Sequence, residues 1–547
     1  MFLKARTSAI ALMAMSVPAL ADVTPAEVWQ NSVDFYKANG YEVAEGAREE
    51  AGDTLIVKDV VLSQKTEGGT LNVTIPEVNL KGTGDGKVTT TMSDTSSIVG
   101  AFKTEDDKNV DVKATIKMPG ATTVSSGDKA DMTHQATLPQ LAITVDEVKT
   151  GDKTLANLLT ITGTDASYTQ HIVTTDANTK ADIQGAVASL NAKVDVDSKD
   201  DEGQPVVVKA DWTVQNLQSS GTSTIPANVN ISENVDAAIK AGLDGDGTFQ
   251  AGESKLVLNM DVPNEEDGTQ RDKIDANVDT AAITGTFKVA ADGLTYLVDT
   301  DGIKVAMTTN SAPFPINFAM DSVTTGLQFP IQKSDTPAPF KLNYELAGVT
   351  MGDEIWNLFD SQKKLPRDPM SLAIDLTGAA KVNVDILDPA AMQALEDGTQ
   401  ADGTPDPSDT TAPAEDADVT DGTDTTNTDT TDADVVDTPE PFAPTELTIN
   451  QIALSGLGAK INAEGELKAP EGGTLETPIG TINARYEGLN TLLGKLVEAQ
   501  LVPEDQLSGI RMMMAMFAKP AEGNDVLTTD LEFKEGGSIF ANGQQIK

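Results

Sequence analysis

The chain has 547 residues, and its 39 Lys+Arg against 85 Asp+Glu give a formal net charge of −46. Such an excess of acidic residues argues against general binding to nucleic acids, which requires a basic surface, and against simple attraction to anionic lipid head groups. The chain has no cysteine. Disulfides, thiolate nucleophiles and cysteine metal sites are therefore excluded.

The first residues have the features of a secretory signal peptide. Lys4 and Arg6 precede a short apolar stretch at residues 9–17, and small residues at 19 and 21 follow it. This order predicts export with cleavage after Ala21, rather than a buried N-terminal helix. No later stretch is apolar enough to span a bilayer. We expect a periplasmic protein without a transmembrane segment, and an extracellular location is the alternative.

The segment after the predicted cleavage site has the pattern of a short amphipathic helix. Thr24 and Glu27 form the sequence signature of a capping box. Gly40 suits the left-handed residue that ends many helices. We expect Trp29 and Phe35 to pack on the sheet that follows.

Alternating apolar and polar residues dominate from Thr54 to about Asn383. Examples are residues 55–62, 255–262 and 273–279. This period predicts strands with one buried face, and the Gly-, Asp- and Asn-rich breaks between them predict tight turns. The predicted fold class is mainly β, with one or more elongated antiparallel sheets of many hairpins. The pattern fits either an open, curved groove or a closed sandwich of two sheets.

Helical patterns interrupt this series in three places. A short one covers residues 353–359, and two longer ones near residues 492–497 and 503–517 predict a C-terminal helical hairpin. Residues 527–534 and 539–546 then predict a closing strand pair. For the cluster Met512–Phe517 we favour packing in the core, and the alternative is a movable apolar lid over a ligand groove.

Between about residues 389 and 444 the sequence consists largely of Asp, Thr, Gly, Pro and Ala. Few apolar residues and dense like charge predict a disordered acidic insert at a hairpin tip. The predicted organisation is a signal peptide at 1–21, a β-rich region at 22–388, the insert at 389–444 and a segment at 445–547 that completes the same fold.

No motif for catalysis, a cofactor or a metal stands out. Asp244–Glu253 resembles an EF-hand loop, but Phe249 and Lys255 occupy positions that require Gly and an acidic residue. An Asp- and Gly-rich turn is the preferred interpretation. The only histidines, His134 and His171, have no acidic residues arranged around them in the sequence as a triad or metal site would require. We therefore expect no catalytic, cofactor-binding or metal-binding residues and no cofactor.

Several strings along the chain resemble one family. They are Asp22–Trp29, Leu365–Pro369, Gly488–Asn490, Leu501–Gln506, Arg511–Met513, Phe533–Gly537 and Ala541–Gln544. In order, they resemble the secreted alphaproteobacterial proteins of the domain of unknown function 2125 family. The resemblance implies no activity, ligand or catalytic residue. A looser similarity is to AsmA-like envelope β-proteins, whose grooves are thought to handle lipids.

Three functions are considered on the basis of the sequence. The favoured one is a non-catalytic, exported β-rich protein that assembles or maintains the cell envelope or handles lipid, with a lipid or an envelope protein as partner. The second is a calcium-responsive extracellular or surface protein. The third is a hydrolase using carboxylates, for which no constellation of residues argues. The sequence does not specify the oligomeric state.

Overall fold

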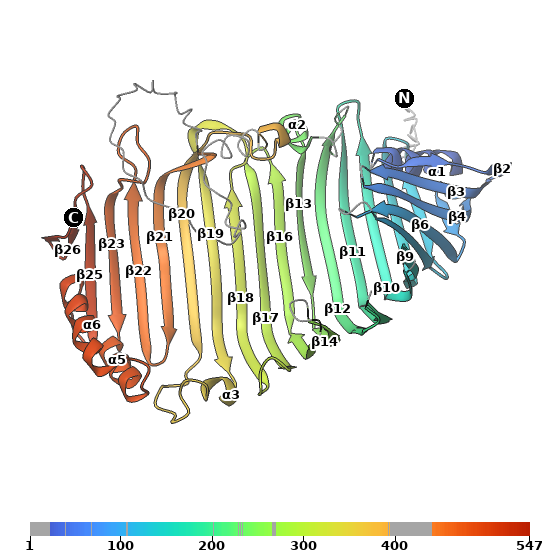
Figure 1. Cartoon of the computed structure of the whole chain (residues 1–547). Helices are drawn as coiled ribbons and strands as arrows, with labels where there is room; N and C mark the ends of the chain where they lie inside the picture. The colour runs from blue at the N-terminus through green and yellow to red at the C-terminus, as the bar shows by residue number, and fades with distance from the viewer. Residues whose placement is uncertain are drawn as a thin grey trace, which may run out of the picture. The chain divides into compact units, whose positions relative to one another are not determined.

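The structure, a computed structural model, is mainly β and confirms the predicted fold class (Figure 1). It describes residues 22–391, 393 and 440–547, apart from residues 39, 67, 105–107, 152, 201, 228, 230, 232–233, 265–267 and 269. The predicted signal peptide at residues 1–21 and most of the predicted insert at residues 389–444 lie outside the described residues. The 27 strands pair in antiparallel fashion, as the hairpin pattern predicts.

The chain divides into two compact units. Unit 1 comprises residues 1–222 and 254–273, and unit 2 comprises residues 223–253 and 274–547. The elements of unit 1 are α1 (Pro25–Ala38), β1 (Glu42–Ala44), β2 (Ala47–Ala51), β3 (Thr54–Thr66), β4 (Gly69–Gly82), β5 (Val88–Met92), β6 (Thr95–Lys103), β7 (Asn109–Lys117), β8 (Thr122–Gly127), β9 (Asp131–Thr150), β10 (Lys153–Thr174), β11 (Asn178–Lys199), most of β12 (Pro205–Pro226) and β14 (Ser254–Pro263).

Unit 2 holds the remaining elements, which follow one another largely as sequential hairpins. They are α2 (Val235–Lys240), β13 (Asp244–Ala251), most of β15 (Arg271–Thr280), β16 (Ala282–Ala290), β17 (Gly293–Thr309), β18 (Ile316–Phe329), β19 (Ser334–Met351), α3 (Asp353–Trp356), β20 (Met370–Val382), β21 (Phe442–Gly456), β22 (Ala459–Lys468), β23 (Ile479–Glu487), α5 (Leu489–Glu498), α6 (Glu504–Phe517), β24 (Lys519–Pro520), β25 (Val526–Phe533), β26 (Ile539–Ala541) and β27 (Gln544–Gln545).

Helix α1 covers part of the sheet in unit 1. The predicted capping box is present, because Glu27 accepts the backbone N–H of Thr24 at 2.9 Å and the Thr24 hydroxyl accepts that of Glu27 at 3.3 Å. Trp29 is 4% exposed and its indole N–H donates to Glu45 at 2.7 Å. Phe35 was expected to pack on the sheet as well, but it is 44% exposed. It lines a cavity between α1 and strands β5, β8, β9 and β10 and is not part of the buried core.

Strand β3 reverses the alternation of its apolar residues halfway along. Leu55 and Val57 have odd numbers, whereas Val60 and Leu62 have even numbers, yet all four are buried in one core. Asp59 lies between the two pairs with a left-handed backbone, at φ 50°. The pairing with β4 keeps its register on both sides of Asp59. The left-handed residue therefore keeps the apolar side chains on one face while the ladder continues.

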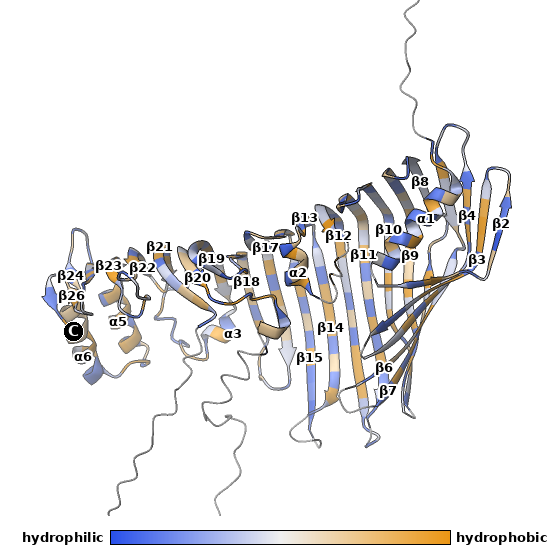
Figure 2. Cartoon of the chain, turned by 90° about the horizontal axis from the view of Figure 1, so that it is seen from above, coloured by the Kyte–Doolittle hydropathy of each residue, from blue (hydrophilic) through white to orange (hydrophobic). Residues whose placement is uncertain are grey.

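A left-handed residue that shifts the alternation of a strand occurs in both units. In β10 the apolar residues change from odd to even numbers around Asp165, at φ 49°, and in β17 they change from even to odd around Gly302, at φ 62°. Figure 2 shows the alternation of hydrophobic and hydrophilic residues along the strands. Asp and Gly suit these positions, since both adopt the left-handed region more readily than most residues.

The Asp- and Gly-rich segment at residue 244 is strand β13, not the expected turn. The pairing of β13 with β16 places Gly247 of β13 and Gly285 of β16 opposite aromatic rings. A Cβ on Gly247 would lie 2.4 Å from the Phe287 ring, and one on Gly285 would lie 2.1 Å from the Phe249 ring. The direct neighbours Gly247 and Phe287 therefore fit together, as do Phe249 and Gly285. Pairing with β16 leaves no EF-hand loop here.

The strands that flank the acidic insert are neighbours. Strand β20 ends at Val382, which pairs with Phe442 at the start of β21. The two strands on either side of the insert along the chain are thus paired, and β21 begins at Phe442, within the range predicted for the insert. The Phe442 ring stacks on Phe329 with centroids 4.5 Å apart and meets Phe340 edge-on at 5.4 Å.

Candidate functional site

One face of the sheet in unit 2 is apolar across nine strands. Directly paired residues of neighbouring strands point to the same face of a sheet. The registers therefore define transverse rows of side chains from β16 to β25. The Leu327 row consists of Phe287, Tyr296, Leu327, Leu342, Leu376, Ile449, Gly465, Ile482 and Leu531.

Two further rows lie on the same face. The Val323 row consists of Ile283, Thr300, Val323, Leu346, Leu372, Leu454, Ile461, Tyr486 and Leu527. The Thr529 row runs between them and consists of Gly285, Val298, Thr325, Tyr344, Ile374, Ile452, Ala463, Ala484 and Thr529. We call these three rows the apolar face. They contain no charged side chain.

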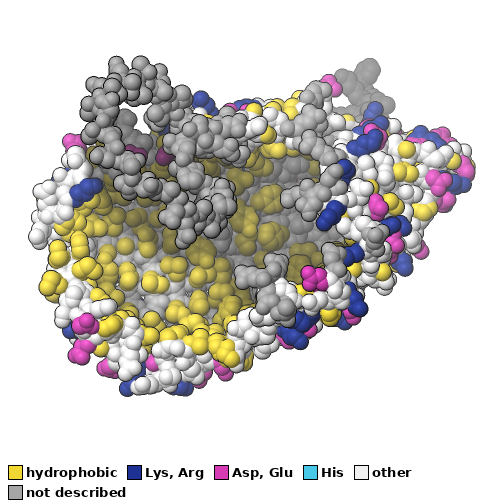
Figure 3. Space-filling view, in the orientation of Figure 1, with side chains coloured by type: hydrophobic (Ala, Val, Ile, Leu, Met, Phe, Trp, Pro, Cys, Tyr) yellow, Lys and Arg dark blue, Asp and Glu magenta, His cyan; other side chains and the backbone are white. Residues whose placement is uncertain are grey.

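The next row on the opposite side of the sheet is polar. It contains Lys288, Thr295, Gln328, Lys341, Thr377, Thr448, Glu466, Thr481 and Glu532. The two sides of unit 2 therefore differ sharply in chemistry. Figure 3 shows the hydrophobic side chains gathered on a hollowed face over these strands.

The apolar face is open in the part of unit 2 that the structure describes. Phe287 is 52% exposed, Leu327 39% and Leu454 49%. In that part of the chain no second sheet covers these side chains, so the open arrangement holds there rather than the sandwich. A row across nine strands, with eight spacings of about 4.8 Å, is about 40 Å long. Monomeric soluble proteins seldom expose so large a continuous apolar surface.

The C-terminal helical hairpin is confirmed, but its packing differs from the favoured expectation. Neither α5 nor α6 contains a buried residue. Met513 is 61% exposed and Phe517 40%. The cluster Met512–Phe517 is thus not ordinary core.

A cavity of about 270 Å³ lies between these helices and the end of the apolar face. Its lining consists of Tyr486, Leu489, Ile510, Met513, Met514, Phe517, Ala518, Leu527 and Thr529. Tyr486 and Leu527 belong to the Val323 row, so the cavity continues the apolar face. Thr529 is 4% exposed, and its hydroxyl oxygen is buried without a hydrogen-bond partner.

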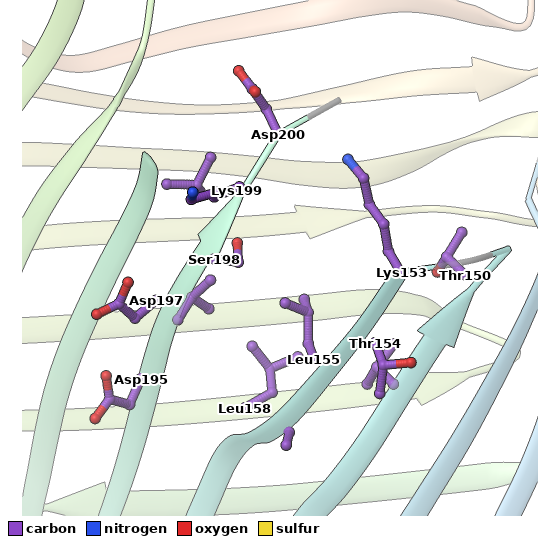
Figure 4. Close-up of a pocket in the computed structure, with 14 residues that line it drawn as sticks. Thr150, Lys153, Thr154, Leu155, Leu158, Asp195, Asp197, Ser198, Lys199 and Asp200 are labelled. Carbon is purple, nitrogen blue, oxygen red and sulfur yellow. The ribbon is translucent and has the colours of Figure 1, made fainter. Parts of the chain in front are cut away.

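Unit 1 has a separate cavity of about 700 Å³ at the ends of β9, β10 and β11 (Figure 4). Leu155 and Leu158 of β10 contribute to its apolar part. Asp195 and Asp197 of β11 point away from these leucines in Figure 4. The lining therefore mixes apolar and charged groups without a convergent set of catalytic side chains.

His134 fastens α1 to the sheet of unit 1. Its Nδ1 lies 2.7 Å from the Ser125 hydroxyl on β8, and its Nε2 lies 3.1 Å from the Asn31 side-chain oxygen on α1. Burial lowers the pKa of His134. Ser125 is fully buried, so its hydroxyl is closed to a substrate. No local sequence pattern predicts the contact between α1 and the sheet, because Asn31 and His134 are 103 residues apart along the chain.

His171 lies between the carboxylates of two aspartates that no sequence motif connects with it. Its Nε2 is 2.7 Å from Asp131 on β9, and its Nδ1 is 3.5 Å from Asp182 on β11. The hydrogen bond to Asp131 is the main cause that raises the pKa of His171. The two carboxylates approach opposite sides of the ring and do not converge on a shared point. No group of three or more His, Asp or Glu side chains suited to a metal occurs among the described residues.

The two histidines should affect stability in opposite directions with pH. The raised pKa of His171 gives a contribution that is complete below its unfolded pKa of about 6.5 and is lost as the pH rises through the folded value. The lowered pKa of His134 instead destabilises the fold as the pH falls below about 6.5, because the unfolded chain takes up the proton first. NMR titration of both rings, with melting of His171→Gln and His134→Gln from about pH 5 to about pH 8, measures this. A His171 pKa below its ordinary value would contradict the prediction.

The residues Leu365–Pro369 belong to the connection between α3 and β20 in unit 2, which several hydrogen bonds stabilise. Asp360 accepts the backbone N–H groups of Lys364 and Leu365 at 2.7 and 3.0 Å. The Arg367 guanidinium lies 5.3 Å from the centre of the buried Trp356 ring. Asp368 accepts the N–H of Gly458 at 3.1 Å. These contacts hold the connection between α3 and β20 in place.

The fold and this surface define a class of protein: an antiparallel β-sheet protein with one open apolar face. The chain belongs to the family described as an uncharacterized protein conserved in bacteria, the domain of unknown function 2125, whose model matches residues 255–540. The matched region includes every strand of the apolar face. A search of curated proteins found no similar sequence. No helix in the described residues is both long and apolar enough to cross a membrane.

Proposed function

We propose that this protein is a non-catalytic, exported component of the cell envelope that binds the acyl chains of lipids on the apolar face of unit 2. The observation that carries the proposal is the continuity of the three rows, which present aliphatic side chains and no charge across nine strands. An acyl chain is the complementary ligand, because it gains from leaving water and needs no polar partner.

The dimensions support an acyl ligand. The hydrocarbon of a single bilayer leaflet is about 15 Å thick, half of a core of about 30 Å. The rows, at about 40 Å, are long enough for more than one chain end to end. Exposed Leu327, Leu342 and Leu454 would be shielded by the ligand.

The expected setting is the periplasm, since the N-terminal sequence resembles a signal peptide cleaved after Ala21. Export would give the protein access to membrane lipids without a membrane span of its own. The calcium-responsive alternative has less support, because the EF-hand-like segment is a strand and the described residues contain no metal-ligand cluster.

Native mass spectrometry of the mature protein, purified from periplasm without detergent, tests the proposal. We expect lipid to remain bound and to be released by mild activation as diacyl or monoacyl species. The protein mass should correspond to a chain that starts at Asp22. Protein that carries no lipid, and that also fails to take up a pyrene-labelled acyl chain after delipidation, would contradict it.

A further inference from the structure

The cavity between α6 and strands β23 and β25 differs from the rest of the apolar face. Most of that face is open, whereas this end is roofed by Ile510, Met513, Met514 and Phe517 of α6. Its floor is formed by β23 and β25, where Leu527 and Thr529 end their rows. An acyl chain that lies along the apolar face would therefore reach a partly covered cavity at this end.

Two residues of the lining, Tyr486 and Thr529, carry a hydroxyl, and only Thr529 is buried. The hydroxyl oxygen is buried and has no hydrogen-bond partner, while the residue is only 4% exposed. A buried hydroxyl without a partner costs free energy in the unliganded protein. Ligand sites are commonly apolar cavities with a few such polar groups that fix orientation.

The chemistry of the lining restricts the ligand. None of the nine lining residues is charged. An ionised carboxylate or phosphate would lose its hydration here without gaining an opposite charge, which is strongly unfavourable. A neutral carbonyl oxygen, by contrast, can accept a hydrogen bond from the Thr529 hydroxyl.

We propose that this cavity is a specific site for an uncharged acyl ester, and that the ligand displaces the side chains around the buried Thr529 hydroxyl, which then donates a hydrogen bond to the ester carbonyl. This inference rests on the proposed function, since it names the ligand group held at one end of the apolar face. Met513 and Phe517 line the cavity while remaining 61% and 40% exposed, so they mark its mouth.

Calorimetric titration of the delipidated mature protein with monooctanoylglycerol, an uncharged ester, and with octanoate, its ionised acid, tests the site. Wild-type protein should prefer the ester. Thr529→Val keeps the side-chain shape and should weaken ester binding by about threefold to tenfold, the value of one net hydrogen bond. Thermal stability should be unchanged or higher, because the substitution removes an unpartnered hydroxyl.

Thr481→Val is the matched control, since Thr481 lies on β23, one of the two strands of the cavity floor, but belongs to the row on the polar side of the sheet. It should leave ester binding unchanged. Met513→Asp, at an exposed position, should weaken binding at least as much as Thr529→Val by placing a charge at the mouth.

The outcomes separate this inference from the proposed function. If wild type binds the ester but Thr529→Val binds it equally well, or if Thr481→Val weakens it as much, the site is wrong while acyl binding by the face stands. Equal affinity for octanoate and the ester would likewise overturn the site. If wild-type protein binds neither octanoyl probe nor a pyrene-labelled acyl chain, the proposed function itself fails.

Discussion

Trp29→Ala should lower the free energy of unfolding of unit 1 by about 3–5 kcal/mol, the usual cost of emptying a large buried site. Trp29 lies on α1 and is 4% exposed. Its side chain packs in the core that includes Leu55 and Val57. The substitution also removes the 2.7 Å hydrogen bond to Glu45. Helix α1 should therefore detach at lower denaturant concentrations than the rest of the unit.

Urea unfolding followed by circular dichroism, together with hydrogen exchange of α1, measures this effect. Trp212→Ala is the matched control, because Trp212 belongs to the same unit but is 43% exposed. Its replacement also removes a hydrogen bond, at 2.8 Å to Ser254, but should cost clearly less than that of Trp29, because much of its side chain is already in water. Equal losses for the two tryptophans would show that α1 is not part of the core.

Leu327→Asp should reduce acyl binding by tenfold or more while leaving unit 2 folded. Leu327 lies in the middle of the apolar face, paired with Tyr296 and Leu342, and is 39% exposed. An aspartate there would lose hydration whenever an acyl chain covered it, and an unpaired charge is costly to bury. The unliganded protein should tolerate the change, because the new carboxylate can remain in water.

Gln328→Asp introduces the same charge one residue along the strand, on the polar side of the sheet. It should leave acyl binding unchanged. Lipid retained in native mass spectra and the uptake of a pyrene-labelled acyl chain provide the two measurements. A similar loss in both variants would point to net charge or stability as the cause, and would argue against the apolar face as the binding surface.

The family string Leu365–Pro369 shows how a recognisable sequence feature can be structural. Arg367 and Asp368 are the kind of charged residues that often indicate chemistry. In the structure Arg367 stacks near Trp356, and Asp368 binds the backbone of Gly458. Their role in unit 2 is to fix the connection before β20.

Much of the local structure could be predicted from the sequence, because it depends on neighbouring residues. Thr24 and Glu27 specify the start of α1, and the alternation at residues 255–262 specifies β14. The same local signals misled at Asp244, where glycine suited close contact with Phe287 rather than a turn. That contact is made by a strand 40 residues away, and no local pattern contains it.

Local sequence patterns specify a mainly β protein whose strands have one apolar side, with a capped first helix and a helical hairpin near its end. What covers that apolar side follows from the tertiary structure. In unit 1, α1 packs in the core that buries Leu55 and Val57. In unit 2, Leu327 and Leu454 remain exposed, and α6 covers only the end of the apolar face near Thr529. Alternation makes a face apolar through local spacing, but whether it is buried depends on contacts with elements far away in the chain, which spacing does not encode.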